Sequence, residues 1–271
     1  MIRATLILAR REWIRFFRQP HRVIGSLAQP LLIWAFLGAG FSPSFRTPGM
    51  EQISYTEYFY PGILLMLMLF SGIFSTITLI EDRAQGLMQG VLVSPAPRMA
   101  IVMGKVIGGI AIAGIQTLPL LLAAPLLDIP LTWSGLVWLT GGFLIATLGF
   151  TALGFLIAWN MESTAGFHAV MSVFLMPMWM LSGALFPLDH APMWLKSLMI
   201  INPVTHALTL IRTPLYHSPM ELLTSSSYWW AGGIAITWAS ACLVLALWRV
   251  NQVERGLDPA RFISQSPKGP S

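Results

Sequence analysis

Residues 58–80 read YFYPGILLMLMLFSGIFSTITLI and carry no charged side chain. At 1.5 Å per residue, a helix of this length matches the roughly 30 Å hydrocarbon core of a bilayer. Five further uncharged apolar runs cover residues 23–41, 106–127, 133–158, 167–188 and 228–248. Because the charged residues of the chain all lie outside these six runs, the sequence predicts an all-α polytopic membrane protein with six transmembrane helices.

The composition excludes several classes of protein. The chain has 271 residues, of which 55% are hydrophobic and 10% are charged, whereas soluble domains contain about 25% charged residues. This balance excludes soluble enzymes. The single cysteine, Cys242, lies in the last run, which excludes a disulfide framework and a cysteine-based metal site. The net charge is +5, but the basic residues form no cluster with stacking aromatics, so we expect no nucleic-acid partner.

The basic residues predict the orientation of the chain. When the segments between the runs are assigned to alternate sides, Arg46, Lys196 and Arg212 are the only lysines or arginines on one side. The other 13 of the 16 lie on the opposite side. By the positive-inside rule, both termini are expected in the cytoplasm.

Three segments flank or interrupt the runs. Residues 1–22 are predicted to form an amphipathic interface helix in the headgroup region. Its apolar side is formed by Ile2, Leu6, Ala9, Trp13, Phe16 and Phe17, opposite Arg11, Arg15, Arg18 and Arg22. The pattern fits a membrane anchor, and leaves open whether the helix also docks a cytoplasmic partner. The six-span domain is expected over residues 23–258, followed by a cytoplasmic tail over 259–271.

The outer segment 189–227 is too apolar for an ordinary loop, and its apolar pieces are too short to span a membrane. Residues 191–195 and 197–201 are apolar on either side of Lys196, and this first piece is separated by Asn202-Pro203 from a second apolar piece, residues 204–211. Neither piece can cross a bilayer, so they are predicted to form short re-entrant helices that dip into the outer leaflet before the last span.

The absence of certain chemical groups from the six runs limits the kinds of transport that the chain could carry out. They contain no charged residue that could couple transport to ions. The chain also has no phosphate-binding loop, because Gly104-Lys105 is followed by valine. Active transport would therefore need ATP hydrolysis on a separate subunit. An intramembrane hydrolase using Ser182 or His168 is an alternative, and a channel or scaffold without energy input is another.

The cytoplasmic loop 81–105 is the segment best suited to bind such a subunit. Leu87, Met88, Val91 and Leu92 form a short amphipathic stretch that ends at Ser94-Pro95. A helix of this kind could insert into a groove of a soluble partner, although a solvated connecting loop has the same pattern.

These residues resemble a known family. The loop Leu92-Val-Ser94-Pro95-Ala-Pro97-Arg98, followed by Gly104-Lys105, resembles the cytoplasmic loop of ABC-2 type transporter permeases. Residues 175–212 resemble the signature of that family through Leu181-Ser182-Gly183-Ala184, Asn202-Pro203-Val204-Thr205-His206 and Arg212. Two positions depart from the family pattern. Val204 replaces a larger residue or threonine, and Gln89 replaces an acidic residue.

The resemblance implies a permease subunit that dimerises and pairs with two copies of a separate ABC ATPase, which holds ATP and Mg. The chain itself would then be no enzyme and bind no cofactor. The ATPase-coupling interface would comprise Arg10, Arg11, Arg15, Glu81, Gly86, Ser94, Pro95 and Arg98. The outer gate would comprise Ser182, Gly183, Asn202, Pro203, His206 and Arg212. The implied activity is ATP-driven export of a drug-like molecule, a lipid or a lipid-linked glycan across a bacterial cytoplasmic membrane.

Overall fold

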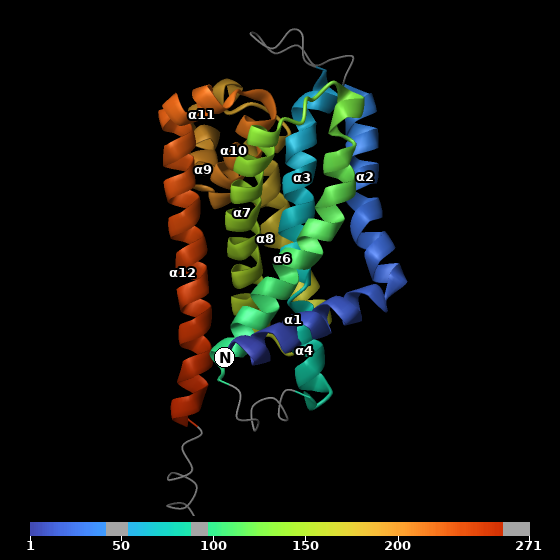
Figure 1. Ribbon diagram of the computed structural model, residues 1–271, viewed down its shortest axis with the longest axis vertical. Coiled ribbons are helices and arrows are strands. Elements are labelled where there is room, and N and C mark those ends of the chain that lie inside the picture. The colour runs from blue at the N-terminus through green and yellow to red at the C-terminus, as the bar shows by residue number, and fades with distance from the viewer. Residues whose placement is uncertain (42–53, 88–96, 257–271) are drawn as a thin grey trace, which may run out of the picture.

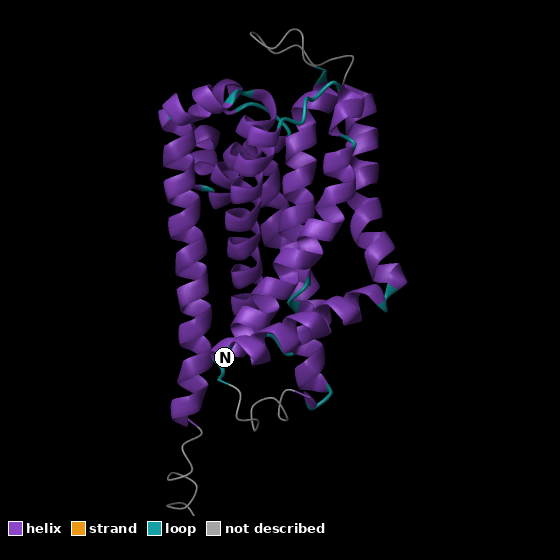
Figure 2. Cartoon of the chain, viewed as in Figure 1, coloured by secondary structure: helices purple, strands orange, loops and turns teal. Residues whose placement is uncertain are grey.

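The fold is a bundle of helices, as the uncharged runs predict. The computed structural model describes residues 1–41, 54–87 and 97–256. Within these ranges the regular elements are all helices and there is no strand (Figure 2). The all-α prediction is therefore confirmed.

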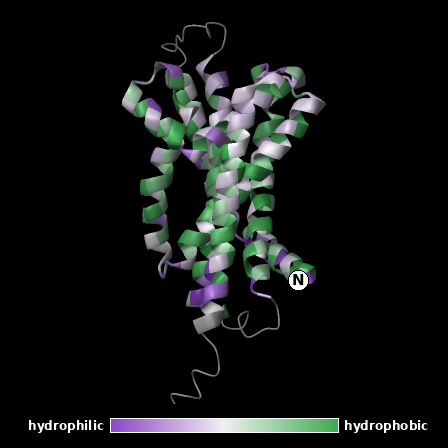
Figure 3. Cartoon of the chain, turned by 90° about the vertical axis from the view of Figure 1, so that its left-hand side faces the viewer, coloured by the Kyte–Doolittle hydropathy of each residue, from purple (hydrophilic) through white to green (hydrophobic). Residues whose placement is uncertain are grey.

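Six helices of the described part are long and apolar enough to cross a membrane, which confirms the predicted number of spans. They are α2 (Pro20–Phe41), α3 (Tyr55–Phe74) continued by α4 (Ile77–Ala84), α6 (Met99–Leu122), α7 (Trp133–Trp159), α8 (Thr164–Trp179) continued by the π-helical turn η2 (Met180–Ala184), and α12 (Ser226–Gly256) (Figure 1). Figure 3 shows hydrophobic residues along the length of these helices, with hydrophilic residues gathered toward the two ends of the bundle.

Helix α3 lies at the centre of the bundle. It packs against α2, α6, α7 and α10, and almost all of its side chains are buried. By contrast, only a small share of the residues of α2, α8 and α12 is buried. Because α3 is enclosed on all sides, its continuous apolar sequence reflects burial inside the protein as well as the membrane environment.

Helix α1 (Ile2–Phe17) lies across one end of the bundle, which we call the α1 end (Figure 1). It ends five residues before the predicted boundary at residue 22, and α2 starts at Pro20. Only part of the predicted apolar side faces the protein: Ala9 and Phe16 are buried, whereas Ile2 and Trp13 are exposed. The exposed side of α1 is thus free to face lipid.

Short helices cover the other end of the bundle, which we call the α11 end. Between α8 and α12 the chain forms η3 (Leu188–His190), α9 (Met193–Ile201), α10 (Pro203–Tyr216) and α11 (Pro219–Thr224), and the 3-10 turn η1 (Ala124–Leu127) precedes α7. The predicted short helices before the last span are confirmed. The second is longer than its apolar stretch, because α10 continues to Tyr216 and packs between α3, α7 and α12.

Candidate functional site

The packing of α1 on α6 rests on two glycines. A Cβ atom on Gly104 would lie 2.6 Å from Leu8 Cβ, and one on Gly108 would lie 3.0 Å from Glu12 Cβ. The first distance is too short for a Cβ atom and the second is a tight contact, so the spacing Gly104-x-x-x-Gly108 allows close helix contact within the chain. The small residues place α1 directly against α6.

This contact buries an ion pair at the α1 end. Lys105 Nζ lies 2.6 Å from Glu12 Oε1, and the two side chains are only 7% and 5% exposed. Thr78 donates a hydrogen bond of 2.7 Å to Glu12 Oε2 and accepts one from Lys105 Nζ. Charges this deeply buried are stable only when they are paired and hydrogen-bonded. The pair therefore joins α1, α4 and α6 at one point.

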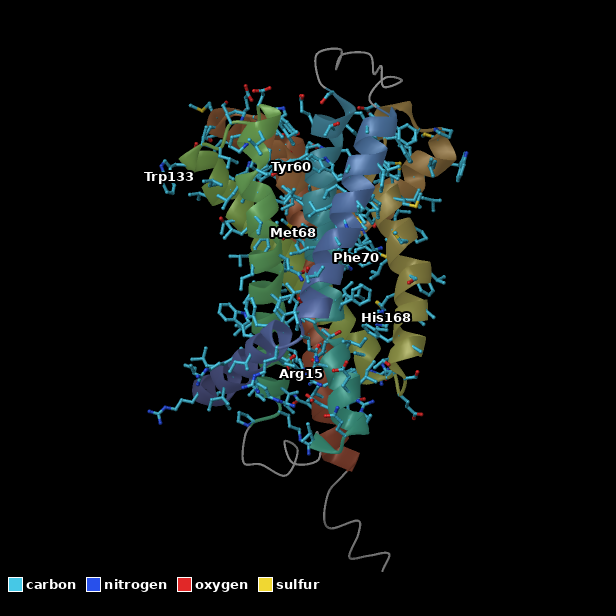
Figure 4. The ribbon with its side chains drawn as sticks, turned by 90° about the vertical axis from the view of Figure 1, so that its right-hand side faces the viewer. Arg15, Tyr60, Met68, Phe70, Trp133 and His168 are labelled. Atoms are coloured by element: carbon cyan, nitrogen blue, oxygen red, sulfur yellow. The ribbon has the colours of Figure 1, made fainter. Side chains whose placement is uncertain are left out.

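A second set of ion pairs extends from this point along α1 and α4. Arg11 binds both carboxylate oxygens of Asp82, at 3.1 and 2.7 Å. Arg15 binds Asp82 at 2.8 Å and Glu81 at 2.7 Å (Figure 4 labels Arg15). Lys105 Nζ lies 3.8 Å from Asp82. We call this set the charge cluster; its members are Arg11, Glu12, Arg15, Glu81, Asp82 and Lys105.

The charge cluster brings together three of the residues predicted for the ATPase-coupling interface: Arg11, Arg15 and Glu81. Arg11 and Arg15 both bind Asp82, and Arg15 also binds Glu81. Arg10 lies on the exposed side of α1, where it lines a shallow groove together with Arg18.

The remaining predicted coupling residues lie around the end of α4 and the start of α6. Gly86 follows α4 with a φ of 72°, a left-handed conformation that favours glycine. Arg98 precedes the first turn of α6. Its Nη1 atom is buried and has no hydrogen-bond partner among the described residues. Ser94 and Pro95 lie outside the described residues.

Sequence reasoning missed Glu12, although one signal was available. Glu12 is the only acidic residue before Glu51, and it lies on a helix that is otherwise basic. A single carboxylate in such a helix indicates a specific cationic partner, and the structure identifies that partner as Lys105.

The α11 end holds the residues of the predicted outer gate, centred on a break in α8. Gly183 has a φ of 86°, and a Cβ atom there would lie 2.7 Å from Leu188 Cδ1. Only glycine fits this position. Ser182 is fully buried and donates a hydrogen bond of 2.6 Å to the Trp179 carbonyl oxygen. This bond within the helix holds the turn and is not a contact with a catalytic base.

Arg212 of α10 binds the carbonyl oxygen that this break exposes. Its Nη2 atom donates to Gly183 O at 3.0 Å, and its guanidinium carbon lies 4.4 Å from the centre of the Tyr58 ring. The Tyr58 hydroxyl donates to the same Gly183 oxygen at 2.8 Å. One carbonyl group therefore connects α3, η2 and α10. The sequence does not indicate Tyr58 as a site residue, because a tyrosine at the end of a span is the usual pattern of an interfacial aromatic.

Asn202 and Pro203 begin α10 and attach it to α8. The Asn202 side chain accepts a hydrogen bond of 3.0 Å from Val204 N, which caps the helix, and donates one of 2.6 Å to Met178 O. Pro203 occupies the first helical turn, where its missing N–H costs nothing. His206 lies apart from these contacts and approaches Ile200 O at 2.8 Å.

The neighbouring Tyr216 connects α10 to the start of α3. Its hydroxyl donates a hydrogen bond of 2.6 Å to Glu57 O. Desolvation raises the pKa of the Tyr216 phenol above its ordinary value, so the hydroxyl keeps its proton and can donate over the physiological pH range.

Comparison with known proteins identifies the family. The model of the ABC-2 type transporter family matches residues 3–216. The chain belongs to the ABC-2 type transporter family. The match covers both the charge cluster and the residues around Gly183 and Arg212. This ABC-2 protein is thus an integral membrane protein and a permease subunit of an ABC transporter, with a role in transport rather than catalysis.

Individual relatives agree with the family. The chain is 29% identical over 249 residues to transport permease ycf38 of Cyanophora paradoxa, covering 91% of this chain and 85% of the relative. It is 24% identical over 228 residues to nodulation protein J of Rhizobium leguminosarum bv. viciae, covering 80% and 87%. It is 28% identical over 158 residues to the multidrug ABC transporter permease YbhR of Escherichia coli K12, covering 57% and 42%. Two of these three relatives are named as permeases.

Proposed function

We propose that this permease forms the translocation path of an ATP-driven exporter in a bacterial cytoplasmic membrane. Two copies would assemble with two copies of an ABC ATPase that holds ATP and Mg. The α1 end would face the cytoplasm, in agreement with the distribution of lysine and arginine. The cargo would be amphipathic or hydrophobic, since the spans carry apolar and aromatic side chains and few ionisable ones.

The charge cluster is the observation that carries this proposal. It fixes α1 and α4 to α6 through pairs as short as 2.6 Å. An ATPase that contacts the exposed side of α1 or the 81–105 loop would therefore move three helices together. Helix α4 continues α3, which runs through the centre of the bundle, so this displacement would reach the membrane-spanning core.

The bonds around Gly183 support a gate at the α11 end. Arg212 and Tyr58 hold the same carbonyl oxygen from two helices. A path that opens between α3 and α10 would have to break at least one of these bonds. The bonds can re-form without any covalent step, as a reversible closure requires.

The proposal is tested by co-expressing the permease with candidate ABC ATPases and reconstituting the purified complex in liposomes. We expect an ATPase to co-purify, and its ATP hydrolysis to rise when an amphipathic cargo is added. Gly86→Val or Arg98→Ala should lower complex formation or this stimulation while membrane insertion is unchanged. If no ATPase co-purifies, the export function is wrong; if neither variant has an effect, the predicted interface is wrong.

A further inference from the structure

A cavity of about 370 Å³ lies beside the charge cluster, between α1, α2, α3, α4, α6 and α8. Its floor is polar. Gln116 of α6 donates a hydrogen bond to Ser26 of α2 and accepts one from Ser71 of α3. Gln116 and Ser71 are 1% and 6% exposed. Gln116 lies about 16 Å beyond Lys105 along α6, at 1.5 Å per residue. Three helices thus contribute neutral hydrogen-bonding groups at membrane depth.

The mouth of the cavity lies between α2 and α8 and is also polar. Figure 4 shows Phe70 and His168 between these two helices. Gln29 of α2 and His168 of α8 line the cavity and are exposed on the surface. Neither side chain forms a hydrogen bond to another described residue. An exposed polar group on a membrane-spanning helix is costly without a hydrogen-bond partner, and a polar ligand at the mouth would supply one to Gln29 and His168.

The walls are apolar and the charges in the lining are neutralised. Phe16, Phe70 and Ile112 form much of the wall. Glu12 and Glu81 also line the cavity, but they are paired with Lys105 and Arg15. A charged head group would therefore meet no free counter-charge from these carboxylates. An uncharged group with hydroxyls could both donate to and accept from the amide and the serines.

We propose that this cavity binds the uncharged, hydroxyl-bearing head group of an amphiphile, with the apolar part of the same molecule against the aromatic walls. The volume is at the lower end for ligand sites, which measure about 300–1,000 Å³. It suits one head group and part of its tail, and not an extended polymer chain. The inference rests on the proposed function where it treats this amphiphile as the cargo.

The test uses the permease–ATPase complex in phosphatidylcholine nanodiscs and an octyl glucoside with a diazirine at the end of its alkyl chain. Photolabelled peptides are identified by mass spectrometry. We expect labelling in α3, α6 and α8 next to the cavity. Unlabelled octyl glucoside should compete, and methyl glucoside at the same concentration should not. Two probes with the same tail but a trimethylammonium or a carboxylate head should label these sites at least tenfold less.

Two variants make the assignment specific to the cavity. Gln116→Leu removes two hydrogen bonds from the floor and should weaken octyl glucoside binding about tenfold. Gln29→Leu changes an exposed residue at the mouth, leaves the interior intact, and should weaken binding about threefold. Thr237→Val on α12 is the control. Its exposed hydroxyl bonds only to Gly233 within its own helix, so binding should not change.

Several results would overturn the proposal. They are labelling spread over the lipid-facing surface, equal labelling by the charged probes, equal competition by methyl glucoside, or unchanged binding in both variants. Failure of the head-group proposal can be distinguished from failure of the proposed export function. A complex that assembles and hydrolyses ATP but leaves the cavity unlabelled refutes the head-group site alone. Failure of any ATPase to bind refutes the export function, and the labelling of the cavity is still measured on the permease.

Discussion

Replacing Glu12 with glutamine should destabilise the protein strongly. The substitution leaves the Lys105 ammonium group 7% exposed, with Asp82 3.8 Å away and already bound by two arginines. Removing one partner of a buried ion pair costs about 3–5 kcal/mol. Lys105→Met leaves the Glu12 carboxylate buried in the same way and should cost a similar amount.

The double variant Glu12→Gln/Lys105→Met should be much more stable than either single variant. It removes both buried charges, and an apolar side chain replaces the ammonium group. We expect a loss of at most about 1 kcal/mol relative to the unmodified protein. With single losses of about 3–5 kcal/mol each, the coupling energy of the pair would then be about 5 kcal/mol or more. The free energy of unfolding is measured by SDS titration in mixed micelles, followed by tryptophan fluorescence.

The chain supplies a matched control for this cycle. Lys196 and Asp189 form an ion pair of 3.4 Å at the surface, with side chains 37% and 88% exposed. Lys196→Met should change the free energy of unfolding by less than about 1 kcal/mol, because exposed pairs contribute little. If the Glu12 and Lys105 losses simply add in the double variant, the pair is not coupled. In that case the Glu12–Lys105 ion pair does not join α1 to α6.

Three further substitutions are measured by the same titration. Gly104→Ala should lower the free energy of unfolding by about 1–3 kcal/mol because the new Cβ atom meets Leu8. Gly141→Ala, with open space around it, should be neutral or stabilising, and equal effects of the two variants would contradict the close packing of Gly104. Asn202→Ala should cost about 1–2 kcal/mol through loss of the cap of α10, and no loss would show that the cap is dispensable. Arg212→Lys should cost about 1–2 kcal/mol, because an ammonium group cannot bind Gly183 O and cover the Tyr58 ring at once; a lysine variant as stable as the unmodified protein would contradict this geometry.

The spans could be predicted from the sequence, because an uncharged run of about 20 residues has few alternatives to crossing a membrane. Searching for uncharged runs cannot detect the buried Glu12–Lys105 ion pair. The third uncharged run starts at residue 106, so the sequence pattern places Lys105 at the boundary of the span. In the structure α6 begins at Met99 and Lys105 is buried inside it. A charge can lie inside a span when another helix brings the opposite charge, and that partner comes from α1.

The site residues show where pattern alone is insufficient. Asn202-Pro203 predicts the start of a helix from local chemistry, and the structure has α10 begin there. Arg11, Arg15 and Glu81 were predicted to meet a partner subunit. Arg11 and Arg15 reach Asp82, and Arg15 reaches Glu81, because α1 crosses the bundle beside α4. The close contact at Gly104 and Gly108 allows that crossing, and the pattern of charges in the sequence does not show it. That Arg11, Arg15 and Glu81 also contact an ATPase subunit stays a prediction.

The two ends of the molecule are connected by α3 and α4. Tyr58, near the start of α3, donates a hydrogen bond to the carbonyl oxygen of Gly183. At the other end, α4 contributes Asp82 to the charge cluster, and Thr78 of α4 donates a hydrogen bond to Glu12 of the same cluster. A helix over residues 58–82 would be about 36 Å long at 1.5 Å per residue, which is enough to cross the hydrocarbon core. Around α3 the packing leaves little free space: a Cβ atom on Gly154 of α7 would lie 2.8 Å from Ile73 Cα. A turn at Ser75-Thr76 separates α3 from α4, but because a close-packed helix cannot bend into its neighbours, we expect a displacement of α4 by a cytoplasmic partner to be passed on to α3. The bonds of Tyr58 and Arg212 to Gly183 are the first that this movement would strain.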